Sequence, residues 1–136
     1  MQDHTATLRR ILARDRTIAV VGLSAEPLRP SHGVARYMQQ HGYRIVPVNP
    51  RYPSILGQTC YARLEDIPFA VDMVNVFRRE ADMPDIARSA VAMGAHSFWQ
   101  QLGLHSREAE RIATEAGLDA VADRCLKVVH AQLMRA

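Results

Sequence analysis

The sequence predicts an α/β fold, a three-layer sandwich in which helices cover both faces of a five-stranded parallel sheet. Short apolar runs alternate along the chain with longer segments of helical periodicity. Successive strands joined by helices form a parallel sheet with helices on both faces. The chain has 136 residues, of which 48% are hydrophobic, and this is enough for a packed core. We therefore expect a single domain over residues 1–136.

The elements follow each other in strand–helix order. Apolar runs predict strands at 17–21, 43–48, 71–76, 95–99 and 118–122. Helical spacing predicts helices at 31–41, 82–93, 106–116 and 124–134, and a short helix around Leu8, Ile11 and Leu12. The long connection at 49–67 is expected to hold only a short helix at 64–67. Pro47 indicates a strand end or an irregularity. With the strands numbered along the chain, we expect the order 3-2-1-4-5.

Composition and charge exclude several classes of protein. Lys and Arg exceed Asp and Glu by 17 to 14, a weakly basic balance that suits an anionic small ligand and is too weak for nucleic acid. No apolar segment reaches the ~20 residues that span a bilayer, and the N-terminus has no signal-peptide core, so we expect a cytoplasmic protein. In that reducing compartment the two cysteines are expected to be unpaired. No histidine pair has zinc-ligand spacing.

The loop after the first strand has the features of an anion site. Gly22, Leu23 and Ser24 follow the strand, and Arg29, Pro30, Ser31 and His32 lead into the helix. Backbone N–H groups at a helix N-terminus are unpaired and favour a phosphate. Ser31 is expected to cap that helix, which would also explain it without a ligand. The G-x-G-x-x-G pattern of dinucleotide sites is absent, because Gly22 is the only glycine in the loop.

The end of the second strand narrows the choice of nucleotide. An NAD site needs an acidic residue there for the ribose hydroxyls. This chain has Asn49, Pro50 and Arg51 instead. A guanidinium suits an additional phosphate on the ribose, which would be the 2′-phosphate of NADP or the 3′-phosphate of coenzyme A. A solvated loop arginine is the alternative reading of Arg51.

The remaining strand ends complete the predicted crevice. Phe77 and Arg78 follow the third strand, and Gln101 and Gly103 follow the fourth. The order 3-2-1-4-5 makes strands one and four neighbours, so Ser24 and Gln101 should face one crevice. Phe77 is as well explained by the core, His32 by the surface, and Gly22 by an ordinary strand end.

We find no catalytic constellation in the sequence. The nucleophile elbow G-x-S-x-G, the Walker A lysine and the H-E-x-x-H motif are all absent. Cys125 lies at the start of the last predicted helix beside Arg124, a position that can lower a thiol pKa. A small buried apolar residue is the other reading of Cys125.

The chain resembles the small stand-alone CoA-binding proteins, which are related to the N-terminal domain of the succinyl-CoA synthetase alpha subunit. The matching stretches cover most of the chain, at residues 18–22, 29–31, 42–51, 71–78, 99–103 and 123–126. The resemblance implies a Rossmann-like fold with the pyrophosphate of coenzyme A against residues 22–24 and 31–32. It implies that Asn49, Pro50 and Arg51 contact the adenosine and its 3′-phosphate, and that Phe77, Arg78 and residues 101–103 line the remaining groove.

The resemblance extends to binding and not to ligase chemistry, since the second subunit, the ATP-grasp module and the phosphorylated histidine of the synthetase have no counterparts in this sequence. The hypothesis is a domain that binds coenzyme A or a short acyl-CoA without catalysis of its own. An NADP-linked oxidoreductase and an accessory or regulatory subunit of an acyl-CoA enzyme are the alternatives. The expected macromolecular partner is a second copy of this chain, in a homodimer, or an acyl-CoA enzyme.

Overall fold

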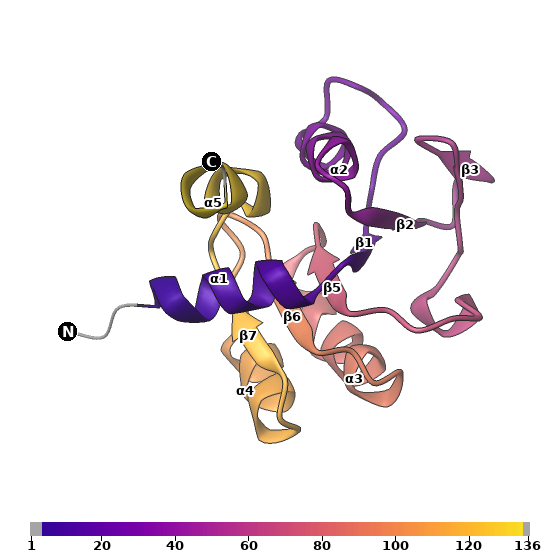
Figure 1. Ribbon diagram of the computed structural model, residues 1–136. Helices are drawn as coiled ribbons and strands as arrows, with labels where there is room; N and C mark the ends of the chain where they lie inside the picture. Colours follow the sequence, from indigo (N-terminus) through magenta and orange to yellow (C-terminus); the bar gives the residue numbers. More distant parts are fainter. Residues whose placement is uncertain (1–3, 135–136) are drawn as a thin grey trace.

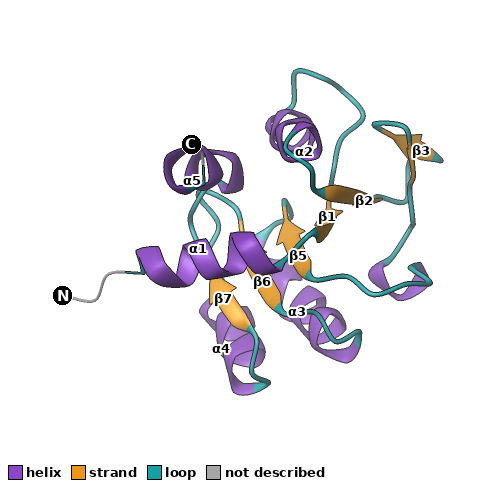
Figure 2. Cartoon of the chain, viewed as in Figure 1, coloured by secondary structure: helices purple, strands orange, loops and turns teal. Residues whose placement is uncertain are grey.

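The computed structural model describes residues 4–134, and Met1–Asp3 of the N-terminal stretch considered for a signal peptide lie outside it. Figures 1 and 2 show a twisted sheet between two layers of helices. The helices are α1 (Thr5–Arg14), α2 (Pro30–Gln40), α3 (Met83–Ala92), α4 (Arg107–Glu115) and α5 (Leu126–Leu133), with short 3-10 turns η1 (Leu64–Asp66) and η2 (Glu80–Asp82). The strands are β1 (Thr17–Val21), β2 (Arg44–Val48), β3 (Ser54–Ile55), β4 (Gln58–Thr59), β5 (Met73–Val76), β6 (Ser97–Gln100) and β7 (Asp119–Val121).

Five parallel strands form the main sheet, in the order β2-β1-β5-β6-β7. This confirms the predicted fold class, a Rossmann-like three-layer sandwich with a five-stranded parallel sheet. All five predicted strands and the five longer predicted helices are present, with ends that shift by a few residues. The short helix expected at 64–67 is the 3-10 turn η1. In the part of the chain described by the structure, no helix combines the length and apolar character needed to cross a membrane.

The predicted strand order 3-2-1-4-5 is wrong, because the third strand, β5, lies between β1 and β6. All four residues of β5 are buried, as a central strand requires. Strand β2 is at the edge, where Pro47 is tolerated. The carbonyl of Pro47 accepts a hydrogen bond from the N–H of Tyr61 on the side away from β1, so the missing N–H of Pro47 breaks no bond within the sheet.

Each face of the sheet has its own apolar core. Helices α1, α2 and α5 cover one face, where Ile11, Met38 and Leu126 pack with Trp99 of β6. Helices α3 and α4 and the turn η1 cover the other face, where Met83 packs with Phe98 of the same strand. The alternating side chains of β6 thus reach both cores.

The connection between β2 and β5 takes the place of a regular crossover helix. It contains the small hairpin β3–β4 and the turn η1. An isolated parallel bridge between Val48 and Tyr61 extends the edge of the sheet beyond β2. Leu64 and Ile67 anchor the connection in the core shared with α3 and α4.

The chain changes faces between β1 and β5, which are neighbours in the sheet. After β1 it runs to α2 on one face, and after β5 it runs to α3 on the other. The loops therefore separate at the carboxyl ends of β1 and β5 and leave a crevice there. Ligands of open parallel α/β sheets bind at such a switch point.

Candidate functional site

Gly22 ends β1 directly at this switch point. Its φ is +87°, and a Cβ at this position would lie 2.6 Å from the carbonyl oxygen of Phe77. The close approach that requires glycine is thus between the ends of two neighbouring strands of this chain. Two pockets open at this crevice, and Gly22 lines both of them, so its bare backbone also faces the crevice.

The loop from β1 to α2 is closed by Ser31, but not as predicted. The backbone N–H of Ser24 donates a 3.0 Å hydrogen bond to Oγ of Ser31. Helix α2 begins at Pro30 with Arg29 as its N-cap, and no side chain caps it. The prediction that Ser31 caps the helix is therefore wrong, because its hydroxyl is bound to the loop. The first turn of α2 keeps its positive end available to a ligand.

A pocket of about 500 Å³ opens at the N-terminus of α2, and we call it the α2 pocket. It brings together most of the residues predicted from sequence: Gly22, Ser24, Arg29, Ser31, Asn49, Pro50, Arg51, Phe77 and Arg78. Glu26, Pro30 and Tyr52 complete it. Three arginines and one carboxylate surround the helix N-terminus, so the pocket is suited to an anion.

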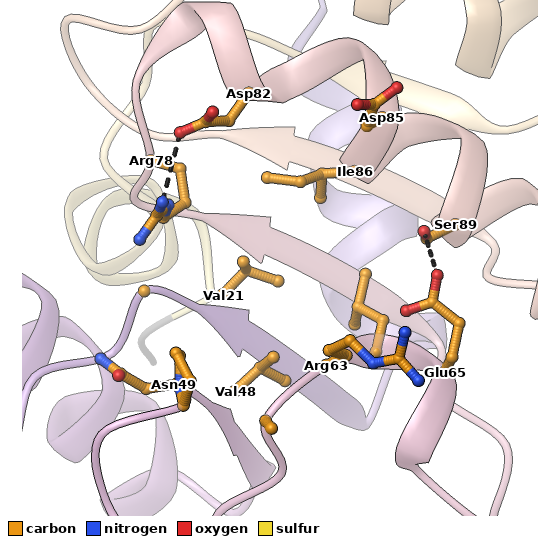
Figure 3. A pocket seen from close by; sticks show the side chains of 14 residues that line it. Val21, Val48, Asn49, Arg63, Glu65, Arg78, Asp82, Asp85, Ile86 and Ser89 are labelled. Carbon is orange, nitrogen blue, oxygen red and sulfur yellow. Dashed lines mark hydrogen bonds and ion pairs between the residues drawn. The ribbon is translucent and has the colours of Figure 1, made fainter.

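A second pocket of about 360 Å³, the α3 pocket, adjoins the first (Figure 3). Gly22, Asn49, Pro50 and Arg78 line both. Its apolar walls come from β1, β2, η1 and α3, through Val21, Val48, Leu64 and Ile86. Its polar residues are Arg63, Glu65, Asp82, Asp85 and Ser89.

The η1 and α3 residues of this pocket could not be identified from the sequence as site residues, because they follow no strand directly. The face change between β1 and β5 brings them to the crevice. With the correct strand order, the start of α3 would have been expected there.

Asn49 forms hydrogen bonds to two neighbouring loops of the site. Its Nδ2 donates to the carbonyl of Leu23 at 3.0 Å, and its Oδ1 accepts from the N–H of Arg51 at 3.0 Å. The thiol of Cys60 donates to its carbonyl at 3.3 Å. The side chain therefore joins the loop after β1 to the turn after β2, and it shapes the site without needing a ligand. Burial raises the pKa of Cys60, which keeps this thiol protonated.

The three arginines of the α2 pocket differ in their partners. Arg29 pairs with Glu26 at 3.3 Å, and Arg78 pairs with Asp82 at 3.3 Å. A hydrogen bond from Arg79 is the largest cause that lowers the pKa of Asp82, and the charges of Arg79 and Arg78 lower it further. Within residues 4–134, Arg51 has no carboxylate within ion-pair distance. It is exposed and free to meet an incoming anion.

Two predicted residues near the loop are buried beside the pockets. Leu23 is fully buried in the core beneath α2, so its side chain serves packing. His32 is 7% exposed, and its Nδ1 is buried without a hydrogen-bond partner. Burial, together with the charge of Arg36, lowers the pKa of His32, so its imidazole is neutral at pH 7. Phe77 packs partly against the same core while it lines the α2 pocket.

Gln101 and Gly103 are not brought to the two pockets. The predicted neighbourhood of Ser24 and Gln101 depended on the wrong strand order, and β5 separates their strands. The Oε1 atom of Gln101 accepts bonds from Nδ2 of Asn75 and from the N–H of Leu126, both at 3.3 Å. The N–H of Gly103 donates to Oδ1 of Asp123 at 2.7 Å. Both residues join the loop after β6 to the start of α5.

Ligands for a metal ion do not gather in the described part of the chain. No group of three or more His, Cys, Asp or Glu side chains among residues 4–134 has a metal-binding arrangement. Cys60 and Cys125 are free thiols, and Cys125 stands at the N-cap of α5.

Comparison with known proteins shows the family to which this chain belongs. Residues 16–131 match a family model whose description is CoA binding domain. The chain belongs to the CoA-binding domain family. This confirms the resemblance noted in the sequence, and the matched region includes both pockets.

Relatives of this CoA-binding domain are found in bacteria and archaea. The uncharacterised protein YneT of Bacillus subtilis is 43% identical over 126 residues, which cover 93% of each chain. A hypothetical protein of known structure from Pyrococcus horikoshii has a TM-score of 0.93 and 37% identity, covering 96% of this chain and 92% of that one. An ADP-forming acetate–CoA ligase II of Archaeoglobus fulgidus is 30% identical over 94 residues, which are 68% of this chain and 14% of the ligase. The domain is therefore related to a part of acyl-CoA synthetases.

Proposed function

We propose that this protein binds coenzyme A, or a short acyl-CoA, along the α2 and α3 pockets as a single CoA-binding domain. The observation that carries the proposal is the α2 pocket itself. It combines an uncapped helix N-terminus with Arg51, a cation without an ion-pair partner among residues 4–134. Coenzyme A has phosphates at two places, the pyrophosphate and the ribose 3′-position. This pocket offers separate donors for each.

The pyrophosphate belongs at the start of α2 in this proposal. The positive end of the α2 dipole lies at this part of the pocket, and Arg29 and Arg78 add positive charge beside it. Both arginines are already paired with carboxylates, at Glu26 and Asp82. A bound pyrophosphate would compete for them, so part of the gain is offset by these ion pairs.

The adenosine belongs at the boundary of the two pockets, with its base in the α3 pocket. Val48 and Ile86 face each other across that pocket from β2 and α3. An apolar slot between two elements suits a flat aromatic base, and the adjoining α2 pocket is where its phosphates would lie. Arg51 follows Asn49 and Pro50 at the rim, within the part of the site expected to meet the ribose and its 3′-phosphate.

The first test is calorimetric titration of the protein with coenzyme A, dephospho-coenzyme A and NADPH. We expect coenzyme A to bind most tightly and dephospho-coenzyme A to bind about ten- to a hundredfold more weakly, the loss expected for a charge-assisted phosphate contact of about 1.5–3 kcal/mol. Binding of NADPH without binding of coenzyme A would contradict the proposal and favour the NADP-linked oxidoreductase.

Two variants separate the role of Arg51 from general electrostatics. Arg51→Gln should bind coenzyme A and dephospho-coenzyme A with similar affinity, because the 3′-phosphate loses its partner. Arg88→Gln removes the same charge from the exposed face of α3, outside both pockets, and should keep the wild-type preference. If Arg51→Gln keeps the wild-type preference for coenzyme A over dephospho-coenzyme A, then Arg51 does not contact the 3′-phosphate.

A further inference from the structure

The α3 pocket ends in a polar pair that the binding of phosphates does not explain. Oγ of Ser89, on α3, donates a 2.7 Å hydrogen bond to Oε2 of Glu65, on η1. Figure 3 shows this pair at the end of the pocket opposite Asn49 and Arg78. The two residues come from segments 24 positions apart, and the bond fixes the direction of the carboxylate.

The position of this pair makes it a candidate for contact with the edge of a base. Asn49 and Arg78 mark the end shared with the α2 pocket, where the phosphates of the proposed ligand lie. A base that enters from this end passes between Val48 and Ile86, and its outer edge then faces Glu65. In a purine nucleotide, that outer edge carries the group at position 6 of the ring.

We propose that Glu65 accepts a hydrogen bond from an exocyclic amine at position 6 of the base, so that the α3 pocket selects adenine over guanine, with Ser89 as a positioning residue. The inference rests on the proposed function, since it takes the ligand to be a purine nucleotide with its phosphates in the α2 pocket. It assigns to the site a preference among bases.

The chemistry of the two bases supports this assignment. Adenine carries an N–H donor group at position 6, whereas guanine carries a carbonyl oxygen there. An ionised carboxylate only accepts hydrogen bonds, and its two oxygens have capacity for more than the single bond from Ser89. The Ser89 bond lowers the pKa of Glu65, which keeps the carboxylate ionised at neutral pH. Guanine in the same orientation would bring its position-6 carbonyl oxygen against this charge, because its own donors are at positions 1 and 2.

Arg63 is the alternative residue for base selection in the same pocket. Its guanidinium pairs with Asp66 at 3.5 Å, an exposed contact, and it also lines the pocket. A guanidinium is a donor, so reading by Arg63 would favour the carbonyl of guanine. The two residues therefore predict opposite base preferences.

The experiment compares the affinities of adenosine 3′,5′-bisphosphate and guanosine 3′,5′-bisphosphate by calorimetry. We expect the wild-type protein to prefer the adenine nucleotide by about tenfold or more, within the range of a base-edge hydrogen bond. Glu65→Gln should lose most of this preference, because its amide can rotate to donate to guanine. Ser89→Ala should weaken the preference while leaving Glu65 in place. Glu115→Gln, which alters an exposed carboxylate paired with Arg111 on α4, should keep the wild-type ratio.

The outcomes separate this inference from the proposed function. If coenzyme A does not bind to the wild-type protein, the proposed function fails. If coenzyme A binds but the two bisphosphates bind equally, or the guanine nucleotide binds better, the reading by Glu65 is wrong. Should Glu65→Gln fail to fold, purine riboside 3′,5′-bisphosphate, which lacks the amine, replaces the variant. Binding of that nucleotide to the wild-type protein as tightly as the adenine nucleotide would overturn the inference.

Discussion

Gly22 shows how strongly one residue is constrained at the switch point. Its positive φ excludes most side chains, and the carbonyl of Phe77 occupies the space that a Cβ would need. The constraint comes from the packing of two strand ends. The same packing opens the crevice between β1 and β5 that holds the proposed site.

Gly22→Ala is expected to destabilise the fold more than Gly57→Ala. Gly57 also has a positive φ, +74°, but nothing lies within 4 Å of an added Cβ there, so it measures the cost of the backbone conformation alone, about 1–2 kcal/mol. Gly22→Ala adds the displacement of the Phe77 carbonyl, a further cost of about 1–3 kcal/mol. Urea unfolding monitored by circular dichroism measures both. Equal losses would mean that the contact with Phe77 relaxes freely.

Several residues that line the α2 pocket could be predicted from the sequence, because they follow a strand or begin a helix. The α2 pocket was found in this way, because a loop with an arginine and a serine before a helix indicates an anion site. The role of Ser31 could not be predicted, since serine serves equally as a helix cap and as an acceptor for a loop N–H. The hydrogen bond from Ser24 decides between the two.

At the scale of elements, the features of two strands favour the strand order that the structure has. Pro47 is compatible with an edge strand, and the run Met73–Val76 has the continuous burial of a central one. Together they favour the order seen in the structure over 3-2-1-4-5. The sequence predicts η1 as a short helix at 64–67, but not its place at the α3 pocket, because a three-residue turn has too little periodicity to reveal its buried face.

The contact between α2 and α5 is expected to make stability depend on pH. Nδ1 of His130 lies 2.9 Å from the hydroxyl of Tyr37, and the ring packs against His41 and Tyr43. Burial, followed by the charges of His41 and Arg16, lowers the pKa of His130 below its ordinary value of 6.5. The unfolded chain therefore binds a proton more readily than the folded one. Stability is retained above pH 6.5 and falls as the pH drops from 6.5 towards the lower pKa of the folded state.

Urea unfolding at several pH values between 8 and 5 would measure this dependence. His130→Gln should flatten the loss on acidification, although it also lowers stability at pH 8 by removing packing and a hydrogen bond. The matched control is His105→Gln, which removes a histidine beside Glu110 on the opposite face and leaves the contact between α2 and α5 intact. Because His32 is also buried with a lowered pKa, some acid sensitivity should remain in His130→Gln. A slope identical to wild type would contradict the role of His130.

At the scale of the whole molecule, α1 lies outside the region matched by the family model, which begins at residue 16. The helix nonetheless belongs to the core on the α2 side, where Ile11 and Leu12 are fully buried. Its Leu12 carbonyl accepts a 2.7 Å hydrogen bond from the hydroxyl of Tyr43. The helix is thus part of the cooperative fold.

Leu12→Ala should lower the free energy of unfolding by about 2–5 kcal/mol, the usual cost of a cavity in a packed core. Arg9→Ala, on the exposed side of the same helix, should change it little. The single tryptophan, Trp99, is fully buried in the central part of the sheet, so its fluorescence reports unfolding of the whole domain. A wild-type transition for Leu12→Ala would mean that α1 is dispensable for the fold.

The central claim is that one nucleotide occupies both pockets at the switch point between β1 and β5. A crystal structure of the protein with coenzyme A tests it most directly. We expect the pyrophosphate at the N-terminus of α2, the 3′-phosphate near Arg51, and the adenine between Val48 and Ile86. Coenzyme A bound away from the carboxyl ends of β1 and β5, or with its adenine outside the α3 pocket, would contradict the account.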